Sequence, residues 1–212
     1  MSATTVPASS GLTRREFLFY IWGASMALFT AEFAGLFVWF ALPRFKAGEF
    51  GGVFEVPIDS LPTTNDEPAG FSEGRFWLVN LDTSQANNKM YRASDENQDI
   101  VGVAAVYKVC THLGCIYAWN KANERFECPC HGSKYRLDGR RVEDPAPRTL
   151  DRFEIQAVDV NGTILATAEK DADTGSYLPL VLPANTAEIW VNTGVKARGA
   201  SLPLISEIGR AS

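Results

Sequence analysis

Two short stretches decide the fold of this 212-residue chain: Cys110-Thr111-His112-Leu113-Gly114-Cys115 and Cys128-Pro129-Cys130-His131-Gly132-Ser133. We call them box 1 and box 2. Together they contain all 4 cysteines and both histidines of the chain. Random placement would rarely gather every thiol and imidazole within residues 110–131. Thiolates and imidazoles are ligands of transition metals, so the two boxes predict one metal centre built jointly.

Two kinds of metal centre use such a donor set. A [2Fe-2S] centre of the Rieske type needs two thiolates on one iron and two imidazoles on the other. The alternative is a structural zinc site, which usually pairs its ligands as C-x2-C or H-x3-H within one knuckle. The boxes instead read C-x-H-x2-C and C-x-C-H, and the adjacent Cys130 and His131 cannot easily serve one tetrahedral ion. The spacing therefore favours the iron–sulfur centre.

The stretch from Cys110 to Leu150 resembles the Rieske subunits of cytochrome bc-type and bf-type complexes. The likeness covers both boxes and the spacing between them, and it extends to Gly139-Arg140-Arg141-Val142. Asp144-Pro145-Ala146-Pro147 is similar to the proline loop that covers one side of the cluster in that family, although Asp144 replaces the usual glycine. The resemblance implies an all-β, antiparallel Rieske-type sandwich with an inserted cluster-binding subdomain.

The resemblance also implies the ligands of one [2Fe-2S] cluster, which are Cys110, His112, Cys128 and His131. This set leaves Cys115 and Cys130, one from each box, and a disulfide between them would clip the two loops together. Disulfides persist in oxidising compartments, which agrees with export of the domain.

Further residues are expected to surround the cluster. By resemblance, the Ser133 hydroxyl bonds a bridging sulfide and the Tyr135 hydroxyl bonds the thiolate of Cys110. Donors aimed at sulfur stabilise the reduced cluster and raise its potential. Residues expected to shield the cluster are Leu113, Pro145 and Pro147.

A long apolar run from Phe17 to Leu42 contains one charged residue, Glu32. A helix of that length spans roughly 39 Å, enough to cross a hydrocarbon core of about 30 Å with some tilt. Basic residues flank both ends, so they do not fix the orientation. Thr13-Arg14-Arg15-Glu16-Phe17-Leu18 resembles a twin-arginine export signal, although two ordinary flanking arginines remain the alternative. We expect an uncleaved single-pass anchor at 17–42, a cytoplasmic segment at 1–16 and the cluster domain on the outer, periplasmic or lumenal, side.

The rest of the chain divides by composition. Residues 43–52 include three glycines within Lys46–Gly52 and predict a flexible hinge. Residues 53–170 predict the Rieske domain, with the cluster-binding subdomain at about 108–148. Short segments rich in β-branched and aromatic residues predict its antiparallel strands: Val53–Val56, Arg75–Leu81, Gly102–Val109, Arg152–Val158 and Thr163–Thr167. Residues 171–212 form a C-terminal extension that either adds edge strands or wraps a neighbouring subunit.

Composition limits the possible functions. A hydrophobic content of 46% supports a packed core, and the net charge of −5 gives no electrostatic case for binding nucleic acid. The resemblance implies electron transfer in a membrane respiratory or photosynthetic complex. His131 and His112 would contact quinol, and the head would pass its electron to a c-type or f-type cytochrome.

The implied partners are quinol, a b-type cytochrome subunit and a c- or f-type cytochrome, within a homodimeric complex of several subunits. The chain would then be one subunit of a quinol–cytochrome c, or plastocyanin, oxidoreductase and not an enzyme alone. The alternative is the small Rieske subunit of an arsenite-oxidase-type molybdoenzyme. An oxygenase centre needs a mononuclear iron on two histidines and a carboxylate, and both histidines are already in use.

Overall fold

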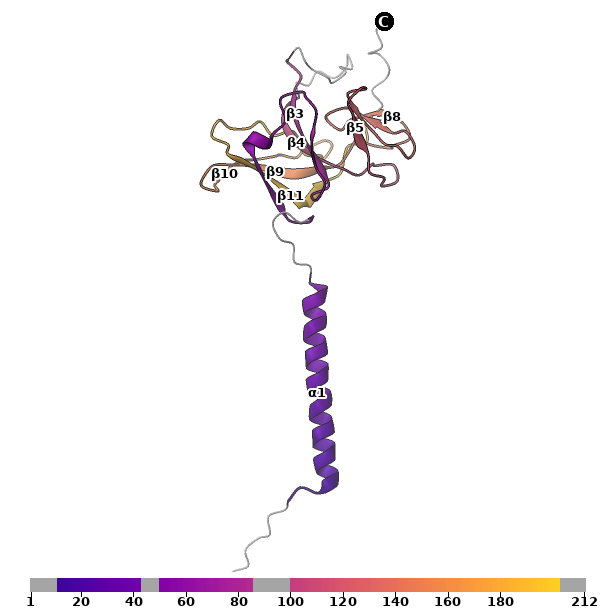
Figure 1. The fold of residues 1–212 in the computed structure, drawn as a ribbon, viewed down its shortest axis with the longest axis vertical. Helices are drawn as coiled ribbons and strands as arrows, with labels where there is room; N and C mark the ends of the chain where they lie inside the picture. Colours follow the sequence, from indigo (N-terminus) through magenta and orange to yellow (C-terminus); the bar gives the residue numbers. More distant parts are fainter. Residues whose placement is uncertain (1–10, 43–49, 86–99, 203–212) are drawn as a thin grey trace, which may run out of the picture. The chain divides into compact units, whose positions relative to one another are not determined.

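The computed structural model describes residues 11–42, 50–85 and 100–202 (Figure 1). The chain separates into two units, Met1–Arg44 and Phe45–Ser212. The described part of the first unit is a single helix. The described part of the second unit consists of strands and one short 3-10 helix.

Helix α1 (Arg14–Ala41) is long and apolar enough to cross a membrane. It begins three residues before the predicted start because Thr13 and Glu16 form a capping box. The Thr13 hydroxyl accepts from the Glu16 amide, and the Glu16 carboxylate accepts from the Thr13 amide at 2.9 Å. After the charged first turn its side chains are exposed and, apart from Glu32, mostly apolar on every face, which is typical of a helix surrounded by lipid.

The larger sheet has seven antiparallel strands. Their order is β1-β11-β9-β4-β3-β2, and β10 also pairs with β9. The short helix η1 (Ile58–Ser60) follows the first strand. The strands are β1 (Val53–Pro57), β2 (Ala69–Phe71), β3 (Phe76–Asp82), β4 (Val101–Tyr107), β9 (Arg152–Val158), β10 (Ile164–Thr167) and β11 (Glu188–Ala197).

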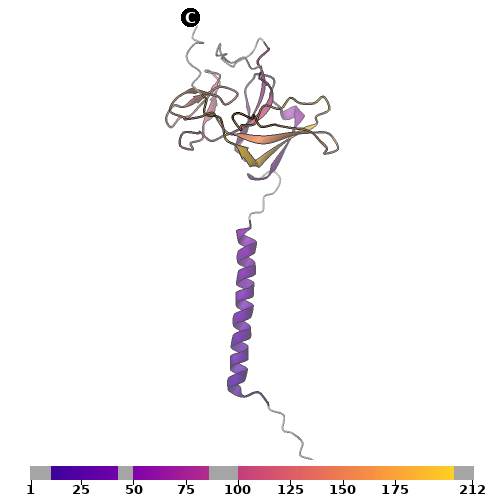
Figure 2. The same ribbon diagram turned by 180° about the vertical axis from the view of Figure 1, so that it is seen from behind.

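The smaller sheet is inserted between β4 and β9. It has four antiparallel strands in sequential order: β5 (Ala118–Asn120), β6 (Arg125–Glu127), β7 (Lys134–Tyr135) and β8 (Arg141–Glu143). Because β4 and β9 pair with each other at Ala105–Phe153, the insertion leaves and returns at neighbouring strands. In both views β5 and β8 lie at the opposite end of the domain from β10 (Figures 1 and 2). The predicted antiparallel sandwich with an inserted subdomain is therefore confirmed.

Strands β3 and β4 are buried on both faces, which is why their sequences show little polar alternation. Side chains point to alternate faces of a strand. On β4, Val103 and Ala105 enter the core of the larger sheet, while Ala104 and Val106 enter a second core shared with the cluster-binding subdomain. Strand β3 divides its side chains between the two cores in the same way. The two cores therefore fix the subdomain against the larger sheet.

A buried ion pair strengthens this junction. The Arg136 guanidinium donates to both carboxylate oxygens of Asp138, at 2.9 and 2.7 Å. Arg152, at the start of β9, donates to the Asp138 carbonyl and to the Tyr177 carbonyl, both at 2.7 Å. Burial alone would raise the pKa of Asp138, but the charge and hydrogen bonds of Arg136, the charge of Arg152 and the Arg140 amide together outweigh it and lower that pKa. The carboxylate is therefore charged and satisfied inside the protein.

Two predicted boundaries are wrong. The domain does not end at 170, because β11 lies inside the sheet between β1 and β9. Nor does the predicted hinge extend to 52: the Gly51 amide donates to the Thr193 hydroxyl at 2.8 Å, and the Phe50 ring stacks on Tyr107. The other hinge residues, 43–49, and the end of the chain, 203–212, lie outside the described residues.

Gly102 in β4 offers a test of the packing of Leu180 on this strand. Its φ is +123°, and a Cβ atom there would lie 2.6 Å from the Leu180 carbonyl. We expect Gly102→Ala to lower the free energy of unfolding by about 2–5 kcal/mol, from backbone strain plus overpacking. Thermal and urea unfolding followed by circular dichroism measure the loss.

Gly162→Ala is the matched control. Gly162 also has a positive φ, +79°, but no atom lies within 4 Å of its added Cβ. This substitution introduces backbone strain without overpacking, so it should lower the free energy of unfolding by only about 1–2 kcal/mol. Equal losses in the two variants would contradict the close approach of Leu180.

Candidate functional site

Box 1 and box 2 fold into turns with the same backbone hydrogen bonds. In box 1 the Cys110 amide donates to the Cys115 carbonyl and the Gly114 amide donates to the Cys110 carbonyl, at 2.8 and 3.0 Å. In box 2 the Cys128 amide donates to the carbonyl of residue 133 and the Gly132 amide donates to the Cys128 carbonyl, at 2.9 and 3.0 Å. Both glycines have a φ of +82°, which other residues rarely adopt. The glycine four residues after the cysteine therefore allows each turn.

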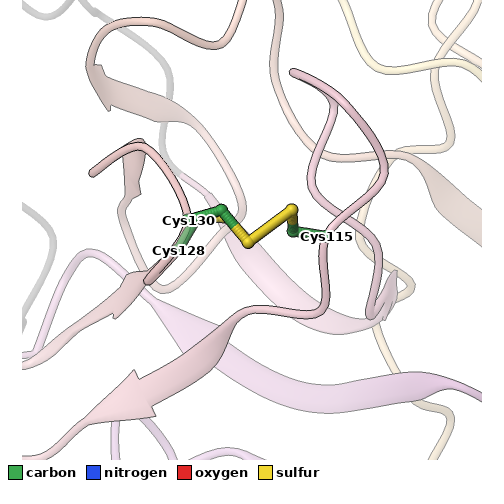
Figure 3. A group of neighbouring side chains, drawn as sticks. All are labelled: Cys115, Cys128 and Cys130. Atoms are coloured by element: carbon green, nitrogen blue, oxygen red, sulfur yellow. A yellow bond between two sulfur atoms is a disulfide. The ribbon is translucent and has the colours of Figure 1, made fainter.

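A disulfide joins the two turns. Cys115 of box 1 is bonded to Cys130 of box 2, with 6.7 Å between their Cα atoms, as the sequence predicted (Figure 3). The Sγ atom of Cys128 lies within 4.8 Å of both disulfide sulfurs. Cys110 and Cys128 are free and buried. The four cysteines thus separate into one cross-link and two thiols available as ligands.

The two imidazoles, one from each turn, lie close together. The ring centroids of His112 and His131 are 4.8 Å apart and the rings are nearly perpendicular, at 88°. His131 is exposed and His112 is half-buried. Leu113 beside them is 69% exposed, and Ile116 is 68% exposed. We call this group of two imidazoles and the exposed apolar side chains of Leu113 and Ile116 the tip.

Two buried polar atoms indicate that the site fits a bound group. Among the residues that the structure describes, His112 Nδ1 and Ser133 Oγ are buried and have no hydrogen-bond partner. Buried polar atoms are nearly always satisfied, so both call for a partner beyond the chain itself. Together with two buried thiols and a second imidazole, they match the donor set of a Rieske [2Fe-2S] cluster.

Tyr135 lies directly behind the thiols. Its hydroxyl is 3.1 Å from Cys110 Sγ and 3.2 Å from Thr111 Oγ1. The side chain is fully buried, with its ring against Tyr117. Burial raises the pKa of Tyr135, so its hydroxyl keeps the proton that a donor needs.

The proline loop is held by Arg141. Pro145 and Pro147 are exposed, while Ala146 between them is fully buried. The Arg141 guanidinium donates to the Ala146 carbonyl at 2.6 Å and to the Leu202 carbonyl at 3.2 Å. Arg141 thus ties the proline loop to Leu202, the last described residue of the chain.

Comparison with known proteins agrees with this geometry. The profile of the Rieske [2Fe-2S] domain matches residues 74–154. The cytochrome b6-f complex iron-sulfur subunit 1 of Synechocystis sp. is 30% identical over 178 residues, which cover 82% of this chain and 97% of that protein. The chain belongs to the Rieske iron–sulfur subunits of cytochrome bc- and bf-type complexes.

Two further matches concern proteins of the same kind. The Rieske subunit described here is 30% identical to the cytochrome b6-f complex iron-sulfur subunit 3 of Nostoc sp., covering 79% of this chain and 92% of that protein. The crystal structure of the plasma membrane Rieske protein PetC3 from Synechocystis PCC 6803 matches with 24% identity and a TM-score of 0.27, over 54% of this chain and 84% of that chain.

Sequence reasoning missed three residues that support the Rieske site. Thr111 lies inside box 1 and contacts Tyr135, Arg141 holds the proline loop, and the Arg148 carbonyl accepts from Thr111 at 2.8 Å. Thr111 was visible as the residue between two expected ligands. The other two act through a long side chain and a backbone carbonyl, for which the sequence carries no signal.

The subdomain also contains a carboxylate whose ionisation stabilises the fold. Glu127 on β6 accepts hydrogen bonds from Arg125, Asn120 and Asn123 at 2.7, 2.7 and 2.8 Å. Partial burial alone would raise the pKa of Glu127, but these bonds and the charge of Arg125 lower it to about 2. Because that value is below the ordinary 4.5, the stabilisation is complete above pH 4.5 and is lost as the pH falls toward 2.

We therefore expect Glu127→Gln to cost about 1–2 kcal/mol of unfolding free energy at pH 7, allowing for solvent screening at this half-exposed site. The cost should shrink at pH 3. Urea unfolding at the two pH values measures it, with the exposed Glu73→Gln as control. An equal cost at both pH values would rule out the ionisation of Glu127 as its source.

Proposed function

We propose that this chain accepts an electron and a proton from quinol in a membrane complex and passes the electron to a c-type or f-type cytochrome. The observation that carries the proposal is the pair of imidazoles at an exposed apolar tip, next to two buried thiols. Few other arrangements of side chains offer electron transfer and proton transfer at one surface.

Some residues of the site would hold the cluster, and others would contact quinol. Cys110 and Cys128 would hold one iron, and His112 and His131 the other. Bound there, the [2Fe-2S] cluster supplies the one-electron chemistry. The exposed imidazole of His131 would accept the hydrogen bond from the quinol hydroxyl and take its proton, with His112 as the second contact.

Other residues would govern access to the cluster. The exposed side chains of Leu113 and Ile116 would exclude water where the tip docks. Pro145 and Pro147 would cover a second side, on the loop that Arg141 holds. When the docked apolar side chains exclude water from around an imidazole, that imidazole exchanges its proton with the bound quinol and not with bulk water.

The proposed partners are supported by the names of the relatives. The relatives named above are iron–sulfur subunits of cytochrome b6-f complexes. We propose a b-type cytochrome subunit, a c- or f-type cytochrome and quinol as partners, in a homodimeric complex that acts as a quinol–cytochrome c or plastocyanin oxidoreductase. Helix α1 would anchor the chain with its N-terminus in the cytoplasm and the cluster domain on the outer side.

Purification of the full chain from its native membrane in mild detergent tests this function. We expect b-type and c- or f-type haem to co-purify, and a Rieske-type EPR signal to appear on reduction by quinol. His131→Ala should abolish the signal, while the exposed control Lys121→Ala should keep it. A molybdenum subunit in place of b-type haem would overturn the proposed complex.

Ser133→Ala tests the hydrogen bond expected at a bridging sulfide. The Ser133 hydroxyl is buried and has no hydrogen-bond partner within the chain, so its removal should leave the cluster in place but destabilise the reduced form. We expect a lower midpoint potential in an EPR-monitored redox titration. Ser72→Ala, in the turn between β2 and β3, should leave it unchanged. An unaltered midpoint in Ser133→Ala would disprove the role of the hydroxyl.

A further inference from the structure

A chain of hydrogen bonds leads from a ligand thiol to the backbone after the proline loop. Cys110 Sγ lies 3.1 Å from Tyr135 Oη, and Tyr135 Oη lies 3.2 Å from Thr111 Oγ1. Thr111 Oγ1 in turn lies 2.8 Å from the Arg148 carbonyl. Thr111 and Tyr135 each carry one hydroxyl proton, so two protons serve these three contacts. The positions of the two protons decide how strong a hydrogen bond the Cys110 sulfur receives.

The Arg148 carbonyl fixes the first proton. A carbonyl can only accept, so the contact at 2.8 Å requires the Thr111 hydroxyl to donate to it. The carbonyl is held in place on both sides: the Thr149 amide donates to the Ala200 carbonyl at 3.0 Å, and the Arg148 side chain pairs with Asp151. Lys196 also binds Asp151, at 3.0 Å. The Thr111 proton thus lies in a short hydrogen bond to a carbonyl that is held in place.

The second proton is consequently shared. With its own proton on Arg148, Thr111 presents only lone pairs to Tyr135. The single Tyr135 proton then faces two acceptors at nearly equal distance, the Cys110 sulfur at 3.1 Å and the Thr111 oxygen at 3.2 Å. Tyr135 is fully buried, so bulk water does not provide another donor. A hydrogen bond shared between two acceptors is weaker at each of them.

We propose that Thr111 is a positioning residue that competes with Cys110 for the Tyr135 proton and thereby lowers the midpoint potential of the cluster. The inference rests on the proposed function, in which Cys110 is a ligand. A donor aimed at a ligand sulfur stabilises the reduced cluster and raises its potential. An acceptor that draws the same proton away has the opposite effect.

Two substitutions on the same hydrogen bond should therefore shift the midpoint in opposite directions. Thr111→Val keeps the shape of the side chain but removes the competing oxygen, so the midpoint of the full chain in detergent should rise. Tyr135→Phe removes the donor, so the midpoint should fall. Thr111→Ser keeps a hydroxyl and is expected to restore the native value. The measurement is a redox titration followed by EPR and visible circular dichroism, which also report whether the cluster is intact.

The double variant separates competition from a structural effect. In the Tyr135→Phe background there is no proton to share, so adding Thr111→Val should produce no further shift. An equal shift in both backgrounds, or a midpoint that stays or falls in Thr111→Val alone, would overturn the proposal. Loss of the cluster in both Thr111→Val and the smaller Thr111→Ala would also overturn it, because the hydroxyl would then hold the turn.

The same titration keeps the two proposals apart. If the native chain gives no Rieske EPR signal, the proposed function fails and Thr111 has no cluster to act on. If the native signal is present and Thr111→Val leaves its midpoint unchanged, only the competition for the Tyr135 proton is wrong.

Discussion

The two turns of box 1 and box 2 have to face each other, and the Cys115–Cys130 disulfide supplies that constraint. Each turn is set locally by a cysteine and a glycine of positive φ. Nothing local sets the distance between them, because one precedes β5 and the other connects β6 to β7. The cross-link also removes open conformations from the unfolded chain, which favours the arrangement in which the turns face each other. The two turns bring the free thiols of Cys110 and Cys128 and the imidazoles of His112 and His131 into one region.

The two turns are supported by a buried core, while part of the candidate site is exposed. The second core, filled from β3 and β4 on one side and by Tyr117, Phe126 and Tyr135 on the other, anchors the subdomain against the larger sheet. The buried pair of Arg136 and Asp138, bound by Arg152, closes the same junction with charge. Cys110 and Cys128 belong to this second core, while the side chains of His131, Leu113 and Ile116 are exposed. A site built on rigid elements holds its geometry as partners come and go.

Much of the site could be predicted because its signals are local. The boxes, the five strands proposed from β-branched runs and the membrane helix depend on short spacings or composition, and the disulfide pair followed from the family resemblance that the boxes carry. The strands of the small sheet are only two or three residues long, so they have no period to detect. The inner position of β11 depends on pairing with β1, far away in the sequence. The network of Thr111, Tyr135 and Arg148 depends on a carbonyl, and every residue has one.

The position of β11 also governs when the domain can become complete. Its residues Glu188–Ala197 pair with β1 and β9, and Val53 is matched to Asn192. The ribosome must therefore release nearly the whole chain before the sheet can close, long after the N-terminal helix has emerged. Such distant pairing slows folding, because the chain loses the entropy of closing a long loop before the stabilising contacts form. The anchor is thus synthesised well ahead of the folded domain, so the membrane segment exists before the fold that it carries is complete.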